Sequence, residues 1–437
     1  MVAAVLDAPR RRAAGRIAPS VVLVMVGIMS TTLAQDAVLG KLPLQNLLKN
    51  GLHESRSATS GFFFLSGIAW YFKPLGGILT DAFPVFGSRR RTYLMASAAL
   101  GTLVWLAVCA VSPRYGALVW MMMLLSVFMM LASTVVGAVL VENAHASGAS
   151  GRLTSLRFTV QGACSIFAAL AGGYLATQWL GWTAIACAAI LFLIVPVAFL
   201  TLHEPKVTAN SQEILAGAGR QLKRILAARP MWAAGGLMAL FYIAPGFGTA
   251  LFFRQQSDLH MAPPAQGVLS MIGAAGAIAG AVSYAFLCRR FRLRTLLLAC
   301  LSLATATTLG YLFYDSFAQA QVIEAVHGFG AALATMSLID LSVRATPAGS
   351  EGLGYALMIS INNLARLGTD WMGSTMLDRL HVPFSSLVLM NAGATLVAVP
   401  LVLLLPLALV RPREAERCDD PSMLVGLQQE GAFDGGV

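Results

Sequence analysis

The chain has 437 residues, of which 57% are hydrophobic and only 11% are charged, and its mean hydropathy is +0.73. A soluble domain usually carries about 25% charged and 45–50% apolar residues. This composition therefore excludes a soluble enzyme or binding module and predicts a membrane protein with several spans. The net charge of +10 would suggest nucleic acid in a soluble protein, but no zinc-finger spacing or aromatic RNA-binding run accompanies it. We expect a lipid bilayer around the protein and no nucleic-acid partner.

The amino-terminal region predicts a first transmembrane helix and not a signal peptide. Arginines at 10–12 and 16 precede an apolar run that begins at Ile17, is interrupted by Gln35 and Asp36, and has no small-residue cleavage site. The six cysteines of the chain form no C-x-x-C pair. We therefore expect neither a disulfide framework nor a metal site, and no residue pattern suggests a cofactor.

Apolar runs recur along the whole chain. A span needs about 20 mainly apolar residues, and about twelve segments meet this rule. In chain order they are 18–39, 57–83, 92–112, 116–143, 153–178, 181–202, 230–253, 265–288, 293–313, 317–343, 352–379 and 384–410. We predict an all-α polytopic membrane protein of two six-helix bundles, the major facilitator fold.

The predicted domains follow from the polar stretches between the spans. Residues 1–202 and 230–412 would form the two bundles, joined by a cytoplasmic linker at 203–229. The Leu215–Leu226 part of this linker is either an amphipathic helix on the membrane surface or a solvated connection. Residues 413–437 are predicted to be a disordered cytoplasmic tail.

Lysine and arginine predict the orientation. With the amino terminus inside, 22 of the 30 basic residues fall in inner segments. The outer segments hold only Lys41, Lys49, Arg56, Arg114, Arg254 and Arg379, and the spans hold Lys73 and Arg366. This bias predicts that both termini are cytoplasmic and that the protein lies in the inner cell membrane.

The two halves resemble each other. "SRRRTYL" follows the second span and "CRRFRLRTLLL" follows the eighth, while Glu142 and Asp340 end the fourth and tenth spans before short Gly/Ser loops. All these pairs are offset by about 200 residues, as in the parallel repeats of major facilitator transporters. We therefore expect two halves related by a pseudo-two-fold axis along the membrane normal.

The inner end of the second span carries an unusual polar sequence. Lys73 precedes Pro74, which bends a helix because it has no backbone N–H, and two glycines then let another helix approach closely. Asp81 follows, separated by a tight Pro84/Gly87 turn from three arginines, Arg89, Arg90 and Arg91. An acid facing arginines at a helix end can form a latch that gates the transport path; alternatively, the arginines only hold the loop inside.

Two segments resemble a known family. "WYFKPLGGILTDAFPVFGSRRRTYL" (70–94) resembles the hallmark of the folate–biopterin transporter family, a branch of the major facilitator superfamily. "TPAGSEGLGYALMISINNL" (346–364) is similar to the segment that opens the family's eleventh span, although Gly352–Leu353 stands where Ala-Thr is expected. The resemblance implies proton-coupled transport of folates or related pterins by alternating access.

Polar groups within spans are the candidate substrate ligands, because burying them in a bilayer is costly. Arg366 lies near the predicted midplane with Asn362 and Asn363, and its planar fork suits a carboxylate; alternatively, it pairs with Asp370, four residues on. Gln161 can bond a pterin edge or join helices. The further candidates are Gln35, Asp36, Lys73 and Arg157. Lys73 alternatively extends to the lipid headgroups.

Four residues are candidates for proton coupling: Asp36, Glu324, His327 and Asp370. Glu324 and His327 are three residues apart and share a helix face. Such a pair can titrate near neutral pH, or it can be a structural hydrogen bond. Near the inner ends, Glu142, Arg157, Asp340 and Arg344 are candidate gating residues along with the latch.

No catalytic motif is present, because HExxH, GxSxG, Walker and GxGxxG patterns are all missing from the sequence. We therefore expect a transporter and not an enzyme, while a channel would need neither the repeat nor the latch. The expected partners are a folate or pterin-like small molecule and protons, and the protein is expected to be a monomer. The alternative is a major facilitator transporter of another organic anion, an amino acid or a drug-like molecule.

Overall fold

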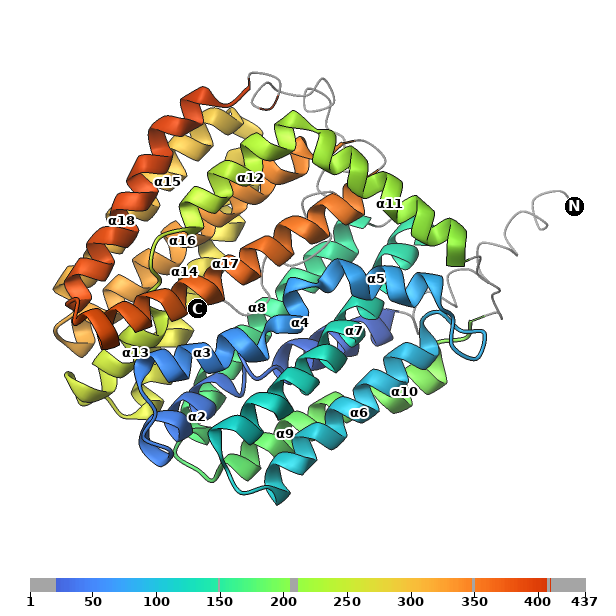
Figure 1. The fold of residues 1–437 in the computed structure, drawn as a ribbon, viewed down its shortest axis with the longest axis horizontal. Helices are drawn as coiled ribbons and strands as arrows, with labels where there is room; N and C mark the ends of the chain where they lie inside the picture. Colours follow the sequence, from blue (N-terminus) through green and yellow to red (C-terminus); the bar gives the residue numbers. More distant parts are fainter. Residues whose placement is uncertain (1–20, 148–149, 205–210, 348–349, 407–408, 410–437) are drawn as a thin grey trace, which may run out of the picture.

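The computed structural model describes residues 21–147, 150–204, 211–347, 350–406 and 409 (Figure 1). Within these ranges the chain is helical, and its β pairing is limited to one bridge between Val85 and Ser88. The predicted tail at 413–437 and the amino-terminal arginines lie outside the described residues. Among the described helices, eight are long and apolar enough to cross a membrane, or nine if one bent pair is counted as a span.

The amino-terminal half contains six helical segments among its described residues. In chain order its helices are Val21–Leu33, α2 (Lys41–Asn46), η1 (Leu47–Gly51), α3 (Arg56–Ser66), α4 (Ile68–Tyr71), α5 (Lys73–Ala82), α6 (Arg91–Ala110), α7 (Tyr115–Ser147), α8 (Ser150–Leu175), α9 (Leu180–Phe192) and α10 (Ile194–Thr201). The first segment is broken at 34–40 and continues to Gly51. The predicted span 18–39 contains this break, and the helical segment extends beyond its predicted end through α2 and η1.

The carboxy-terminal half also contains six segments, preceded by a separate helix. Its elements are α11 (Ser211–Ala227), α12 (Arg229–Tyr242), α13 (Gly248–Ser257), α14 (Pro263–Arg290), α15 (Leu293–Leu309), η2 (Gly310–Phe313), α16 (Phe317–Ala345), α17 (Glu351–Leu380), α18 (Phe384–Leu401) and η3 (Val402–Leu404). The seventh segment is α12 and α13 together. The prediction of an all-α polytopic membrane fold is confirmed.

Two separate hydrophobic cores hold the two halves. One core draws its buried residues from 23–198 and the other from 225–409. Helices α6, α9 and α10 lie at one side of the molecule and α15 and α18 at the opposite side (Figure 1). Between the cores, α8 packs on α14 and α17 packs on α3, α4 and α5. A substrate path between the halves would therefore run along these helices.

Glycine permits the closest approach between the halves. A Cβ atom on Gly173 of α8 would lie 2.9 Å from the Cα atom of Gly267 on α14. The same principle applies within the amino-terminal half, where a Cβ on Gly76 would lie 2.5 Å from Sδ of Met130 on α7. The expectation that glycines after Lys73 admit another helix is confirmed. Small residues allow this packing in a bilayer, where hydrophobicity does not drive helices together.

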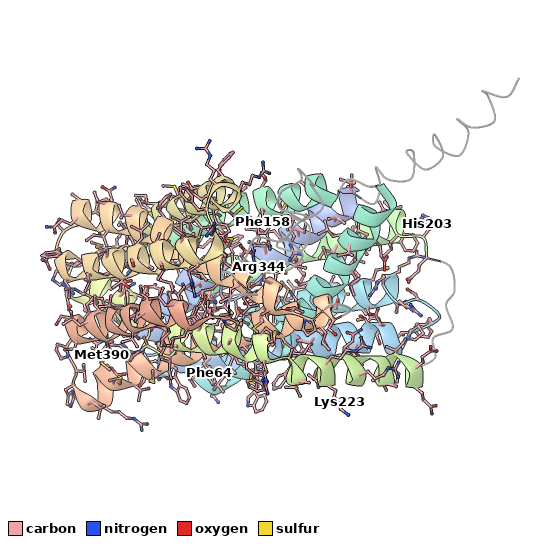
Figure 2. All side chains as sticks on the ribbon, turned by 90° about the horizontal axis from the view of Figure 1, so that it is seen from above. Phe64, Phe158, His203, Lys223, Arg344 and Met390 are labelled. Carbon is pink, nitrogen blue, oxygen red and sulfur yellow. The ribbon has the colours of Figure 1, made fainter. Side chains whose placement is uncertain are left out.

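Helix α11 crosses the ends of the spans at a steep angle (Figure 1), and its axis is bent by 74° from that of α12. It packs on α5, α12 and α17 and buries Ile225, while Leu215, Leu222 and Leu226 remain exposed. Lys223 points away from the bundle (Figure 2). The 215–226 stretch is therefore an amphipathic helix, and its cytoplasmic position stays a prediction.

Candidate functional site

Some of the polar residues of the spans lie where a helix is broken. The first segment breaks at 34–40, where the indole Nε1 of Trp105 donates to the carbonyl oxygen of Ala34 at 2.9 Å and the Gln35 amide donates to the Thr31 carbonyl oxygen at 2.8 Å. A Cβ on Gly40 would lie 3.0 Å from the Asp36 carbonyl oxygen. Irregular backbone at membrane depth needs such internal partners, and in transporters it commonly marks a binding site.

Asp36 is buried inside this break. The Ser66 hydroxyl of α3 is a hydrogen-bonding neighbour of its carboxyl group, while its Oδ2 atom has no hydrogen-bond partner among the described residues. A buried carboxylate oxygen without a donor is costly unless it binds a proton or a ligand. This position suits the predicted role of Asp36 in binding or proton coupling.

Arg366, on α17, lies between the two halves. It is within electrostatic range of Lys41 on α2 and Tyr71 on α4 from one half, and of Tyr242 on α12 from the other. The Tyr242 hydroxyl also has Asn362 and Thr335 as hydrogen-bonding neighbours. Arg366 and Asn362 thus come together as predicted, and Asn363 is buried on the same helix.

Asp370 caps the start of α13. Its carboxylate accepts a hydrogen bond from the Thr249 backbone N–H at 3.0 Å and one from the Thr249 hydroxyl at 2.6 Å. The Gly246 N–H, in the break before α13, donates to the carbonyl oxygen of Thr369 at 2.8 Å. Asp370 therefore has a structural role in the seventh segment, and its predicted part in proton coupling remains a prediction.

Glu324, on α16, is only 5% exposed and accepts two tyrosine hydrogen bonds. Tyr311 donates to Oε2 at 3.2 Å and Tyr314 donates to Oε1 at 3.1 Å. The His327 ring instead meets the Tyr311 ring edge-on, with centroids 4.9 Å apart, and its Nδ1 has no hydrogen-bond partner in the described part of the chain. The sequence placed Glu324 and His327 together but did not reveal the two tyrosines between which they lie.

Lys41 is a residue that the sequence analysis missed. It was assigned to an outer loop, but it opens α2 inside the extended first segment. There it is within electrostatic range of Arg366, Asp370 and Glu324. The missed signal was the apolar run 42–48, which continues the span beyond the interruption.

Arg157 and Gln161 line a small cavity in the amino-terminal half. Its walls are Ile28, Thr31, Ser133, Val136, Gly137, Leu140, Arg157 and Gln161, and the open space among them has room for about one water molecule. Gln161 is 2% exposed and its Oε1 atom has no hydrogen-bond partner among the described side chains and backbone. In this conformation the space is too small for a pterin ring, so a role of Gln161 in binding substrate remains a prediction.

Lys73 does not extend to the lipid headgroups. Its side chain is only 3% exposed, and Nζ lies 5.4 Å from the centroid of the Trp70 ring. The helix breaks at Phe72, directly before it, and Pro74 occupies the first turn of α5. The headgroup alternative is therefore wrong, and burial beside an aromatic ring is consistent with the predicted second cation of the path.

The latch exists, but a single arginine forms it. Arg90 contacts Asp81 at 2.9 Å and Glu142 at 3.1 Å, which joins the second, third and fourth segments. Arg91 instead donates to the Phe199 carbonyl oxygen at 3.3 Å and covers that ring. The predicted tight turn is present, with Gly87 at a φ of 77°. Its role in gating stays a prediction.

Glu204 is a second missed residue at this end of the molecule. Its carboxylate accepts hydrogen bonds from the Ser88 hydroxyl at 2.7 Å and from the backbone N–H groups of Arg89, Arg90 and Arg91 at 3.1, 3.0 and 3.3 Å. These N–H groups belong to the two residues before α6 and to its first residue, which has no acceptor within the helix. Burial raises the pKa of Glu204, but the four hydrogen bonds outweigh it and leave the pKa below its usual value.

Asp340 and Arg344 form the corresponding pair in the other half. Arg344 Nε lies 2.8 Å from Asp340 Oδ1, and the Tyr284 hydroxyl of α14 donates to Oδ2 at 2.9 Å. Asp340 is buried and its partners come from α14 and α16 alone. It therefore lies apart from the Asp81 latch, and the two predicted gates are separate.

At the other end of the bundle the two halves touch through polar groups. The Ser57 N–H donates to Asp378 at 2.7 Å and Arg56 lies 3.4 Å from the same carboxylate. Lys49 Nζ donates to the Ser257 hydroxyl at 2.8 Å. The sequence analysis did not identify this contact, because each partner is an ordinary surface residue until the halves are brought together.

Comparison with known proteins identifies the chain's relatives. The sequence profile of the BT1 family matches residues 37–422. A folate-biopterin transporter of Synechocystis sp. is 27% identical over 87% of this chain and 81% of that protein, and a probable folate-biopterin transporter 2 of Arabidopsis thaliana is 26% identical over 79% and 73%. The crystal structure of a D-xylose-proton symporter superposes with a TM-score of 0.67 at 13% identity, covering 91% of this chain and 100% of that one.

Proposed function

Since this chain belongs to the BT1 family of membrane transporters, we propose that it carries folates or related pterins by alternating access in symport with protons. The observation that carries the proposal is the similarity to folate-biopterin transporters over 87% and 79% of the chain. The expectation of a transporter and not an enzyme is confirmed by the same relatives. The fold agrees with that of a major facilitator transporter.

The polar groups between the halves support an anionic substrate with a flat ring. Arg366 offers a planar fork for a carboxylate, and Lys41 brings a second positive charge from the other half. The Gln161 side chain, whose Oε1 atom has no partner among the described residues, offers an amide for the edge of a pterin ring. Lys73 and Arg157 are further cations for the path of the same anion.

Two buried carboxyl groups support proton coupling. Asp36 has an oxygen without a hydrogen-bond partner in the described structure, and Glu324 lies in a closed pocket of tyrosines. A carboxyl group in such surroundings changes its charge when it takes up a proton, which alters its interactions with Lys41 and Arg366. Either group can therefore link proton uptake to the state of the substrate site.

The test is uptake by purified protein in proteoliposomes. Folate, biopterin, an unrelated dicarboxylate and an amino acid are each offered with and without an inward proton gradient. Accumulation of folate or biopterin against its own gradient, driven by protons, is the expected result. Proton-driven uptake of the dicarboxylate or amino acid alone would replace the proposed substrate by another organic anion or an amino acid. Uptake without response to the proton gradient would remove the coupling.

A further inference from the structure

We propose that Tyr314, Gln255 and Gln266 are positioning residues that connect the proton state of Glu324 to the contact between the two halves. The proposal rests on the proposed function in one respect, namely that Glu324 takes up the transported proton. It identifies how that proton can change which end of the protein is open.

The connection is an unbroken chain of side-chain hydrogen bonds. Tyr314 donates to Glu324 at 3.1 Å, and the Gln255 amide donates to the Tyr314 oxygen at 2.7 Å. Gln266 donates to the Gln255 oxygen at 3.2 Å, and Gln256 donates to the Gln266 oxygen at 3.2 Å. Tyr314, Gln255 and Gln266 are all buried, so water does not compete along this part of the chain.

The outer links of the chain cross from one half to the other. Gln256, on α13, donates to the Asn46 oxygen of α2 at 3.2 Å, and Asn50 donates back to the Gln256 oxygen at 3.1 Å. Lys49, between these two asparagines, donates to Ser257. The chain therefore starts at a buried carboxylate in one half and ends at the contact that holds both halves together.

Every hydrogen bond between side chains in the buried part points toward Glu324, while Gln266 also donates to the Phe252 carbonyl oxygen. Gln256 donates to Gln266, Gln266 to Gln255, Gln255 to Tyr314, and Tyr314 to the carboxylate. An ionised carboxylate only accepts hydrogen bonds, so a series in which each side chain donates to the next can end at it. The observed arrangement is thus that of ionised Glu324.

Protonation removes this end point. Glu324 accepts from Tyr314 on one oxygen and from Tyr311 on the other, and a protonated carboxyl group must use one of these oxygens as a donor. One tyrosine hydroxyl is then left without its acceptor in a buried site, which is unfavourable. Relief comes from turning Tyr314, and that movement weakens the Gln255 and Gln256 links that hold the halves together.

The charged and titratable groups around Glu324 favour a response at this residue. Lys41 faces Glu324 from α2, and Tyr311 and Tyr314 face it from the segment after α15. His327, which is on the same helix as Glu324, lies beside Tyr311. Arg254, which influences Tyr314, is occupied by Asp315 at 3.1 Å. Glu324 is therefore the carboxyl group to which the buried chain is connected.

Hydrogen–deuterium exchange of the full-length protein in nanodiscs, without substrate, tests the connection. Backbone protection of 46–52 and 253–258 is measured at neutral and acidic pH and corrected for the intrinsic exchange rate. We expect protection in the wild type to fall by about 5- to 150-fold on acidification, the change that corresponds to one orphaned buried hydroxyl. Glu324→Gln should already show the acidic level at neutral pH.

Single substitutions test whether the pH response depends on the hydrogen-bond chain. Tyr314→Phe and Gln255→Met interrupt two different links, and both should abolish the pH response. Tyr284→Phe is the matched control, since it removes a buried hydroxyl from another carboxylate, Asp340, and lies off the hydrogen-bond chain, so it should keep the response. Each variant is first checked for wild-type thermal unfolding, and two independent interruptions guard against one failing to fold.

The proposal is overturned if Tyr314→Phe and Gln255→Met keep the wild-type pH response, or if the wild type has none. It is also overturned if Tyr284→Phe loses the response equally, because the loss would then follow from removing any buried hydroxyl. These outcomes are distinct from a failure of the proposed substrate, since the exchange measurement contains no folate or pterin. If the protein fails to take up folate but shows the expected pH response, the hydrogen-bond chain is supported and only the proposed substrate is wrong.

Discussion

At the scale of single residues, Arg366 illustrates how the structure sharpens a choice that the sequence left open. The simplest alternative was that Asp370, one helical turn away, only neutralises this arginine. Asp370 instead accepts two hydrogen bonds from Thr249 and so serves to cap α13. Arg366 lies within electrostatic range of Lys41 from the opposite half. Asp370 and Glu324 also lie within electrostatic range of Lys41, so charges of both signs meet at this point between the halves.

Arg366→Gln should weaken folate transport much more than biopterin transport. Losing a desolvated bidentate partner costs about 2–5 kcal/mol, or roughly 30- to several-thousand-fold in affinity. Biopterin has no glutamate carboxylates for the guanidinium to bind. Arg366→Lys should restore little, because an ammonium keeps the charge but not the fork. Uptake of both ligands in proteoliposomes checks this, and equal losses would assign Arg366 a structural role.

Substitution of the latch residue Asp81 should change the balance between open and closed states less than substitution in a buried ion pair would. Its side chain is 43% exposed, while Arg90 is 13% exposed and also binds Glu142. Exposed ion pairs contribute about 0.2–1 kcal/mol, so Asp81→Asn should shift the balance between open and closed states by only a few-fold. Arg90→Gln, which removes both contacts, should shift it more. Transport rates of the two variants compared with wild type measure this order, and identical rates would leave the acid as a helix-end residue only.

At the scale of elements, the start of α6 depends on a residue 113 positions away in sequence. Helix α6 has no side-chain cap of its own, and Glu204 supplies the missing acceptor to three consecutive backbone N–H groups. Local sequence predicted the turn before α6 but not its partner, because Glu204 follows α10. The hydrogen bonds of Glu204 therefore hold the end of the sixth segment against the turn at residues 88–91.

Glu204→Gln should destabilise the protein at neutral pH by about 0.5–2 kcal/mol, the range for losing a helix cap. Because the hydrogen bonds leave the pKa of Glu204 below its usual value, the ionised group stabilises the fold above the pKa of the unfolded chain. That contribution is lost as the pH falls through the lower pKa of the folded state. Thermal unfolding of wild type and variant should therefore differ at neutral pH and converge in acid. Asp258→Asn, at an exposed position, is the matched control, and an equal effect there would contradict the capping role.

At the scale of the whole molecule, four spans are polar or broken, and they carry the site. The criteria of length and hydropathy miss the first, second and eleventh segments and accept the seventh only as a bent pair with α11. These segments contain Asp36, Lys73, Arg366 and Thr249. A break frees backbone groups that must be satisfied inside the protein. In the first, second and seventh segments polar side chains lie at or beside such breaks, whereas Arg366 lies within the continuous helix α17.

The predicted orientation is testable by labelling. Ala216→Cys, on exposed α11, and Ser112→Cys, in the loop between α6 and α7, lie at opposite ends of the bundle. In a Cys418→Ser background, an impermeant maleimide added outside intact cells should label Ser112→Cys but not Ala216→Cys, because basic segments stay inside. The reverse pattern would place the termini outside. Cys109, Cys164, Cys187, Cys288 and Cys300 are buried or half-buried, which keeps the background low.

The sequence by itself determined the membrane class, the all-helical architecture and the family, because these depend on hydropathy and local motifs that each segment carries alone. It also predicted Asp81 opposite the three arginines after the turn, and the structure shows that Arg90 is the one that pairs with it. Only the tertiary structure decided that Lys41 lies in a span, that Glu204 caps α6 and that Glu324 joins Tyr314 and Gln255. These contacts link residues whose partners lie on other elements, and no periodicity records which helices will meet. The polar contacts between the halves depend on packing alone, and that packing is what an alternating-access transporter must change.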